Sequence, residues 1–204
     1  ILSMTSTTVA NTVFTISLIP FLTAFFSFLI LKEKLAKITI FTMLLAFGGV
    51  LVMFYGVLLI GALWGNILAL FAAICFSIFT IILRMNKNTD MLPCLLMSGV
   101  IAIAFSSFQK MGSLQISSND FFLCFILGAV LSGFVNCCFV FATRHLIAAE
   151  VTLFFFIEIA LSPFWVWLFL NEHTTFNTLI GGIIILISIL LRSIYLLLTK
   201  SKIN

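Results

Sequence analysis

The chain has 204 residues, of which 63% are hydrophobic and 8% are charged, and its mean hydropathy is +1.35. Soluble domains usually carry about a quarter charged residues, so this composition excludes a soluble fold and indicates an integral membrane protein. The net charge of +4 comes from Lys and Arg scattered over short loops. It gives no reason to propose nucleic acid as a partner; the composition predicts a lipid bilayer instead.

Apolar runs follow one another along the chain and are separated by charged or polar residues. The runs lack the alternation of barrel strands, so they predict membrane-spanning helices. The expected spans are residues 9–31, 38–55, 63–83, 91–108, 121–141, 151–170 and 176–198. The uncharged run from 38 to 83 is too long for one span, and its glycines around position 60 offer a turn. We therefore expect an all-α polytopic membrane protein with about seven transmembrane helices.

Basic residues are distributed one-sidedly over the loops that these spans define. If the first loop is cytoplasmic, only Lys110 lies outside, and the other nine Lys and Arg residues lie inside: Lys32, Lys34, Lys37, Arg84, Lys87, Arg144, Arg192, Lys200 and Lys202. Arg192 lies within the last span, and we expect it to snorkel to the inner surface. The positive-inside rule then predicts an inner or plasma membrane protein whose chain starts outside and ends in the cytoplasm.

An internal repeat relates the first span to the sixth. Shifting the sequence by 139 positions (150 − 11) places NTVFTISLIPFLTAFFSFLILKEK over EVTLFFFIEIALSPFWVWLFLNEH and aligns Glu33 with Glu172. The second copy comes five helices after the first, and because five is an odd number the two copies are expected to have opposite orientations in the membrane. Inverted repeats are common in secondary transporters, in which the substrate site lies between the two halves.

Each copy is an apolar helix that ends in Leu-x-Glu and is followed by a glycine-bearing apolar helix, FGGVLV or IGGIIILI. This pattern resembles the repeat of the EamA-like drug/metabolite transporters. The resemblance implies a fold of two inverted five-helix repeats, in which this chain aligns with the fourth to tenth helices. Residues 1–60 would be the C-terminal part of the first repeat and residues 61–204 the second repeat. The three missing helices would indicate either a fragment or a shortened relative.

Glu158 is the most conspicuous polar residue inside a predicted span. An ionisable side chain near mid-membrane is costly, so it should face the bundle interior and is by default a candidate for substrate binding or proton coupling. The alternative is a protonated Glu that only hydrogen-bonds a neighbouring helix. Ser162 lies one turn further along, on the same face.

Other polar residues give weaker candidates for the same site. Asn11, Thr12 and Thr15 cluster on one side of the first span, where they either bind a polar substrate or satisfy neighbouring backbone. Asn136 ends a stripe of Cys124, Gly128 and Ser132 that predicts close helix packing, with a pore-lining Asn as the alternative. A stripe of Asn66, Ala73, Ser77 and Thr80 on the third span is interpreted in the same way. Pro20 and Pro163 should loosen their helices.

Catalytic and metal-binding motifs are not evident in the sequence. The five cysteines have no metal-ligand spacing, and hydrolase and metalloprotease motifs are missing, so we expect neither an enzyme nor a cofactor. We expect a carrier that moves a small metabolite or drug-like molecule by alternating access, with a homodimer left open. The alternative is a non-transporting seven-helix protein with a receptor-like, regulatory or assembly role.

Overall fold

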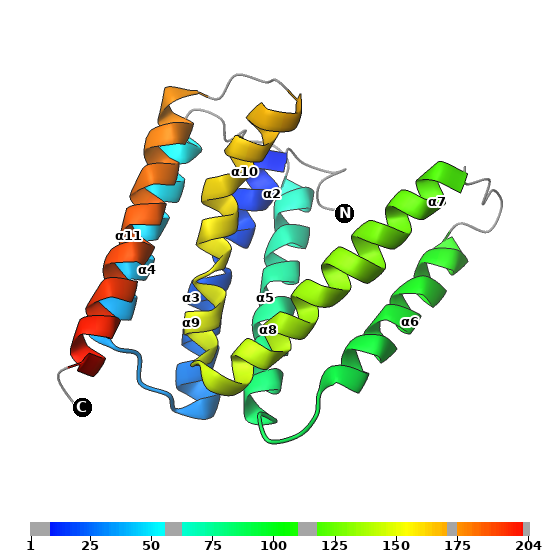
Figure 1. Ribbon diagram of the computed structural model, residues 1–204, viewed down its shortest axis with the longest axis horizontal. Helices are drawn as coiled ribbons and strands as arrows, with labels where there is room; N and C mark the ends of the chain where they lie inside the picture. Colours follow the sequence, from blue (N-terminus) through cyan, green and yellow to red (C-terminus); the bar gives the residue numbers. More distant parts are fainter. Residues whose placement is uncertain (1–8, 56–62, 110–117, 171–174, 202–204) are drawn as a thin grey trace. The chain divides into compact units, whose positions relative to one another are not determined.

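The computed structural model describes residues 9–55, 63–109, 118–170 and 175–201, and this part is almost entirely helical (Figure 1). The α-helices are α2 (Val9–Ile16), α3 (Ile19–Phe26), α4 (Lys37–Met53), α5 (Leu63–Met85), α6 (Leu92–Gln109), α7 (Ser118–Phe125), α8 (Gly133–His145), α9 (Ala148–Thr152), α10 (Phe155–Leu170) and α11 (Phe176–Ser201). Two π-helical segments, η1 (Ser27–Leu31) and η2 (Ile126–Ser132), continue α3 and α7. The described residues contain no strand, which confirms the all-α fold class.

Helices occur at all seven positions where the sequence predicts a span. Five stretches are long and apolar enough to cross a membrane: Asn11–Leu31, Leu63–Met85, Asn119–His145, Ala148–Trp165 and Phe176–Leu196. The other two, Lys37–Met53 and Leu92–Ser106, are apolar but shorter. A helix of 17 residues rises about 26 Å, against a hydrocarbon core of about 30 Å. The polytopic membrane fold is therefore confirmed, with five full-length spans and two shorter apolar helices in the described residues.

Two of the spans are interrupted. A turn at Ser17–Leu18 separates α2 from α3, and a turn at Leu153–Phe154 separates α9 from α10. The first interruption lies directly before Pro20, whose ring nitrogen cannot donate to the preceding turn. Pro163 causes no comparable interruption: helix α10 continues through it. The predicted loosening is thus seen beside Pro20 only.

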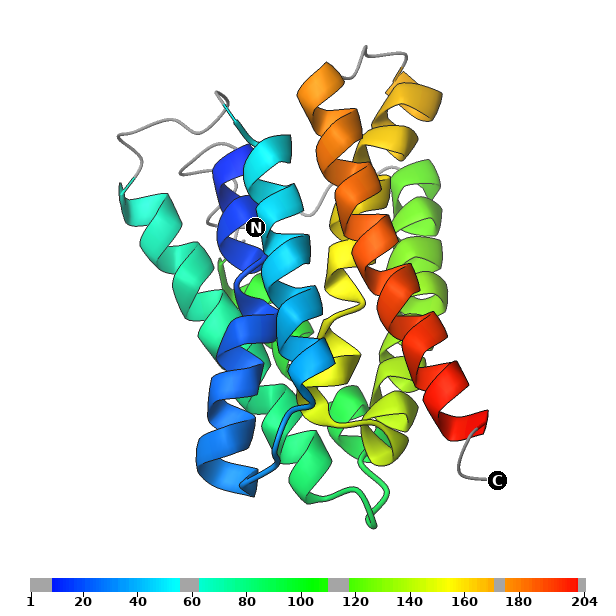
Figure 2. The same ribbon diagram turned by 90° about the vertical axis from the view of Figure 1, so that its left-hand side faces the viewer.

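The chain packs as two compact units. Unit 1 comprises residues 1–81 and 147–204, and unit 2 comprises residues 82–146. In unit 1, α4 packs along α11 and α3 packs against α9. Thr39 contacts Arg192 and, ten residues further along α4, Gly49 contacts Gly181, so α4 and α11 run antiparallel (Figure 2).

The core of unit 1 lies among α4, α9, α10 and α11. Its fully buried residues include Met43 and Val50 from α4, Phe156 from α10 and Ile185 from α11. Phe21 of α3 reaches this core, with its ring centroid 6.4 Å from that of Phe156. Burial of these side chains holds together helices from the two ends of the sequence.

Unit 2 contains the last turn of α5 together with α6, α7, η2 and α8. Polar contacts near the ends of these helices hold them together. Arg84 donates to the carbonyl oxygens of Thr143 and Arg144, the last turn of α8. A cation is favourable there because the final carbonyls of a helix lack partners within it. Arg144 in turn forms an ion pair with Asp90 at 2.8 Å.

Candidate functional site

Glu158 lies on an exposed face of α10. Within unit 1, Glu158 therefore does not face the packed interior, in contrast to the expectation from the sequence. Its carboxylate makes no hydrogen bond or ion pair with any residue that the structure describes, and the exposed residues Leu161, Ser162 and Trp165 continue the same face along the helix. This face thus presents an acidic group beside apolar and aromatic side chains.

Ser162 has a backbone partner that accounts for its position. Its hydroxyl donates to the carbonyl oxygen of Ile159 at 2.9 Å. That carbonyl is the one that residue 163 would bond in a regular helix, and Pro163 has no N–H to offer. Ser162 therefore compensates the proline, which explains why α10 continues unbroken through Pro163.

Asn11 and Thr12 are buried in unit 1, with 3% and 2% of their surface exposed. Thr15 is half-buried, and its hydroxyl donates to the carbonyl oxygen of Asn11 in the preceding turn. The structure thus places two of these three polar side chains inside the unit and gives the third a partner in its own helix.

Asn136 belongs to unit 2 and is exposed. Its side-chain amide donates to the carbonyl oxygen of Ser132, at the end of the π-helical segment η2. The prediction that its stripe packs closely is wrong for the described residues, because Cys124, Gly128 and Ser132 are all exposed and a Cβ on Gly128 would meet nothing within 4 Å. The π-helical turn, which shifts the side-chain periodicity, lies in the middle of this stripe.

The stripe on α5 does pack against a neighbouring helix. Ala73, Ser77 and Thr80 are buried, and the Ser77 hydroxyl lies 3.4 Å from the carbonyl oxygen of Ile19 in α3. The packing interpretation is therefore confirmed for these three residues. Thr23, one turn beyond Ile19, is also buried, and its hydroxyl has no hydrogen-bond partner in the part of the chain that the structure describes.

A buried ion pair that the sequence analysis missed joins three helices of unit 1. The guanidinium of Arg192 in α11 donates to the carboxylate of Glu150 in α9, and its Nε donates to the Thr39 hydroxyl of α4 at 3.3 Å. The Thr39 hydroxyl also lies 3.5 Å from the Glu150 carboxylate. Arg192 is only 7% exposed, so the expectation that it snorkels to the inner surface is wrong. The sequence signals for this pair are a basic residue within an apolar helix, Arg192, and an acidic residue at the start of another helix, Glu150.

The glycine pairs that follow the two repeat helices are also brought together. A Cβ on Gly181 would lie 2.5 Å from the carbonyl oxygen of Gly49, and a Cβ on Gly49 would lie 2.8 Å from that of Gly181. Only glycine allows the two backbones to approach this closely. The helix of FGGVLV and the helix of IGGIIILI therefore meet antiparallel, as corresponding elements of an inverted repeat would.

These features define a polytopic helical membrane protein with discontinuous spans and a close glycine crossing between α4 and α11. The model of the EamA-like transporter family matches residues 1–55 and 63–194. The chain therefore belongs to the EamA-like transporter family. It is a multi-pass membrane protein of the drug/metabolite transporter superfamily, whose EamA-type members are transporters rather than enzymes. No significant match was found among curated proteins or among solved structures.

Proposed function

We propose that the chain is a carrier that moves a small polar or amphiphilic metabolite across the membrane by alternating access, with a substrate site between its two repeats. The observation that carries this proposal is the antiparallel crossing of α4 and α11 at Gly49 and Gly181. In carriers built from inverted repeats, alternating access is largely a rocking or gating movement of one repeat against the other around the site between them. The antiparallel packing of α4 on α11 supports this proposal, because these helices follow the two predicted copies of the repeat.

Glu158 is the residue that we propose for proton coupling or for binding a cationic substrate. Among the predicted site residues, Thr15, Asn136 and Ser162 each donate a hydrogen bond to their own helix, which supports a structural role for them. Glu158 has a titratable group and no partner among the described residues. An unpaired carboxylate within a span is costly, and function is the common reason for retaining one. Asn11 and Thr12 are proposed as secondary polar contacts.

The proposal can be tested in liposomes that contain the purified chain. We expect an imposed pH gradient to drive flux of at least one compound in a panel of amino acids, nucleosides and the cationic dye ethidium. Empty liposomes and liposomes without the gradient are the controls. If correctly inserted, folded protein moves no compound in the panel under either condition, the non-transporting interpretation is favoured instead.

A further inference from the structure

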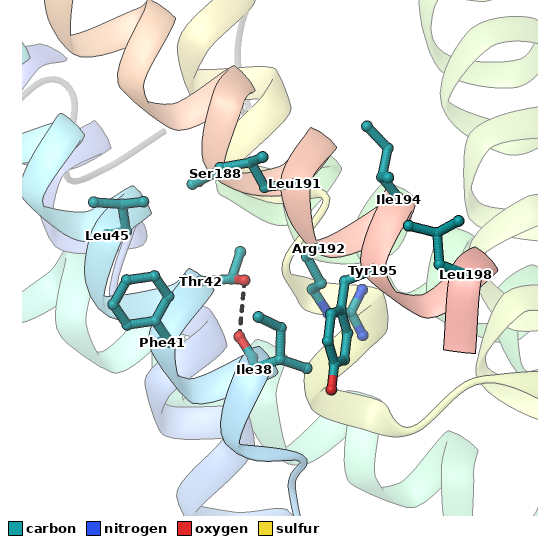
Figure 3. A pocket seen from close by; sticks show the side chains of 10 residues that line it. All are labelled: Ile38, Phe41, Thr42, Leu45, Ser188, Leu191, Arg192, Ile194, Tyr195 and Leu198. Atoms are coloured by element: carbon teal, nitrogen blue, oxygen red, sulfur yellow. Dashed lines mark hydrogen bonds between the residues drawn. The ribbon is translucent and has the colours of Figure 1, made fainter. Parts of the chain in front are cut away.

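A groove runs along the outer side of the contact between α4 and α11, within unit 1. It has a volume of about 340 Å³, and its walls are formed by exposed apolar and aromatic side chains such as Phe41, Leu191 and Tyr195 (Figure 3). Toward the Met53 end of α4 the two helices approach closely at Gly49 and Gly181. The groove lies toward the Lys37 end of α4, where its lining residues include Ile38 and Thr42 of α4 and Arg192 and Tyr195 of α11.

The polar groups on the floor of this groove are already partnered or buried. The Thr42 hydroxyl donates to the carbonyl oxygen of Ile38, and the Ser188 hydroxyl donates to that of Ile185. Arg192 lines the groove while its guanidinium contacts Glu150 and Thr39. Between Ile38 and Leu45 the groove extends about 10 Å along α4, a length that suits a segment of hydrocarbon chain.

The end of the groove beside Ile38 is electropositive. Lys37 is exposed and begins α4, and the preceding loop contributes Lys32 and Lys34 against the single acidic residue Glu33. The N-terminal end of α4 adds its partial positive charge, and its N-cap, Ala36, offers no side-chain oxygen to neutralise it. Glu150 offsets the charge of Arg192, so the excess positive charge comes from the lysines and the helix end.

We propose that this groove binds one phospholipid with an anionic headgroup, from the membrane leaflet that adjoins Lys37. An acyl chain lies between Phe41 and Leu191, and the phosphate lies at the start of α4 beside Lys37. Charge complementarity favours this ligand over a zwitterionic lipid, because juxtamembrane basic residues attract anionic headgroups. It also favours a lipid over a second copy of the chain, since an apolar helix would bring no negative charge to the basic end.

Thermal unfolding of the purified chain in neutral detergent provides the test, with dioleoyl phosphatidylglycerol compared with dioleoyl phosphatidylcholine. The anionic lipid should raise the apparent Tm by about 3 °C or more beyond the effect of the zwitterionic lipid. Leu45→Trp fills the groove and should abolish this difference, whereas Leu44→Trp, at an exposed neighbour outside the groove, should keep it. Lys37→Gln should weaken the difference, and Lys87→Gln in unit 2 should not.

Four results would each overturn the proposal. They are equal stabilisation by the two lipids, full stabilisation by inorganic phosphate alone, an undiminished effect in Leu45→Trp, and a wild-type dimer that Leu45→Trp dissociates without any lipid preference. If Leu45→Trp does not fold, Leu191→Trp replaces it, with Leu190→Trp as its matched control outside the groove. Native mass spectrometry should detect one retained phosphatidylglycerol per chain in the wild type and none in the groove variant.

Discussion

The acidic side chains of unit 1 differ in how their charge is balanced. Glu33 accepts a hydrogen bond from the buried Ser27 hydroxyl at 2.9 Å, and Glu150 pairs with Arg192. Glu158 has no such partner in the described part of the chain, although it lies in the middle of an apolar stretch. Of these three carboxylates, Glu158 is therefore the one whose charge no described residue balances.

Glu158→Gln is accordingly expected to abolish transport that a pH gradient drives, while the protein still folds and reaches the membrane. A neutral amide has no protonation equilibrium for the gradient to bias and presents no charge to a cation. Glu158→Asp, which keeps the carboxylate, should retain part of the flux in the liposome assay. Ser162→Ala should leave flux largely intact and reduce stability by about 1 kcal/mol, because it removes the hydrogen bond to Ile159. Wild-type flux in Glu158→Gln would reduce Glu158 to a structural residue.

The pair of Arg192 and Glu150 predicts a large effect on stability. Glu150→Gln keeps the size of the side chain but leaves the buried guanidinium without its counter-ion, at an expected cost of about 3–5 kcal/mol. Asp90→Asn is a matched control, because Arg144 and Asp90 are 31% and 65% exposed as side chains and such pairs contribute about 1 kcal/mol or less. Thermal unfolding followed by tryptophan fluorescence should separate the two variants clearly. Similar losses in both would contradict a stabilising role for the buried pair.

Some features of the candidate site depend on the local sequence, and others depend on which helices pack together. Spacing along one helix located Asn11, Thr12 and Glu158 as polar residues within spans, because that information is local. It could not indicate which face another helix covers, so the exposure of Glu158 differs from the expectation. The pair between Glu150 and Arg192 joins residues 42 positions apart, and it depends on which helices pack together.

At the scale of helices, length and hydropathy predicted the positions of the elements well but not their internal irregularities. The interruption beside Pro20 has a local cause that the sequence displays. The turn at Leu153–Phe154 and the π-helical segment η1 have no comparable signal, since neither contains a proline or a glycine. Such irregularities depend on tertiary packing as well as on local sequence.

The crossing of α4 and α11 yields a sharp prediction for neighbouring glycines. Gly181→Ala would place a methyl group 2.5 Å from the Gly49 carbonyl oxygen and 2.7 Å from the Met53 backbone nitrogen, so the helices must separate. Overpacking of this kind costs about 1–3 kcal/mol. Gly48→Ala meets nothing within 4 Å and should stabilise α4 by roughly 0.5–1 kcal/mol through helix propensity. The apparent Tm values of the two variants should thus shift in opposite directions; a shared direction would contradict the crossing.

At the scale of the whole molecule, the compact units do not coincide with the predicted repeats. Unit 1 combines residues 1–81 with residues 147–204, whereas the repeats were predicted to divide near residue 60. The physical reason is that α4 packs on α11 and α3 packs on α9, which draws the two ends of the sequence together. The division of the chain into repeats therefore stays a prediction, because the packing of the helices does not test where one repeat ends and the next begins.

Membrane orientation gives the last prediction, and it rests on the eight basic residues other than the buried Arg192 that the sequence assigns to one side. Single cysteines at Lys34 and Lys87, placed in a variant without the five native cysteines, should resist a membrane-impermeant thiol reagent in intact cells. Cysteines at the exposed positions Asn119 and Thr175 should react, because the same rule places them outside. After the cells are permeabilised, all four positions should react, which controls for local accessibility. Reaction at Lys34 and Lys87 in intact cells, with protection of Asn119 and Thr175, would show that the orientation is reversed.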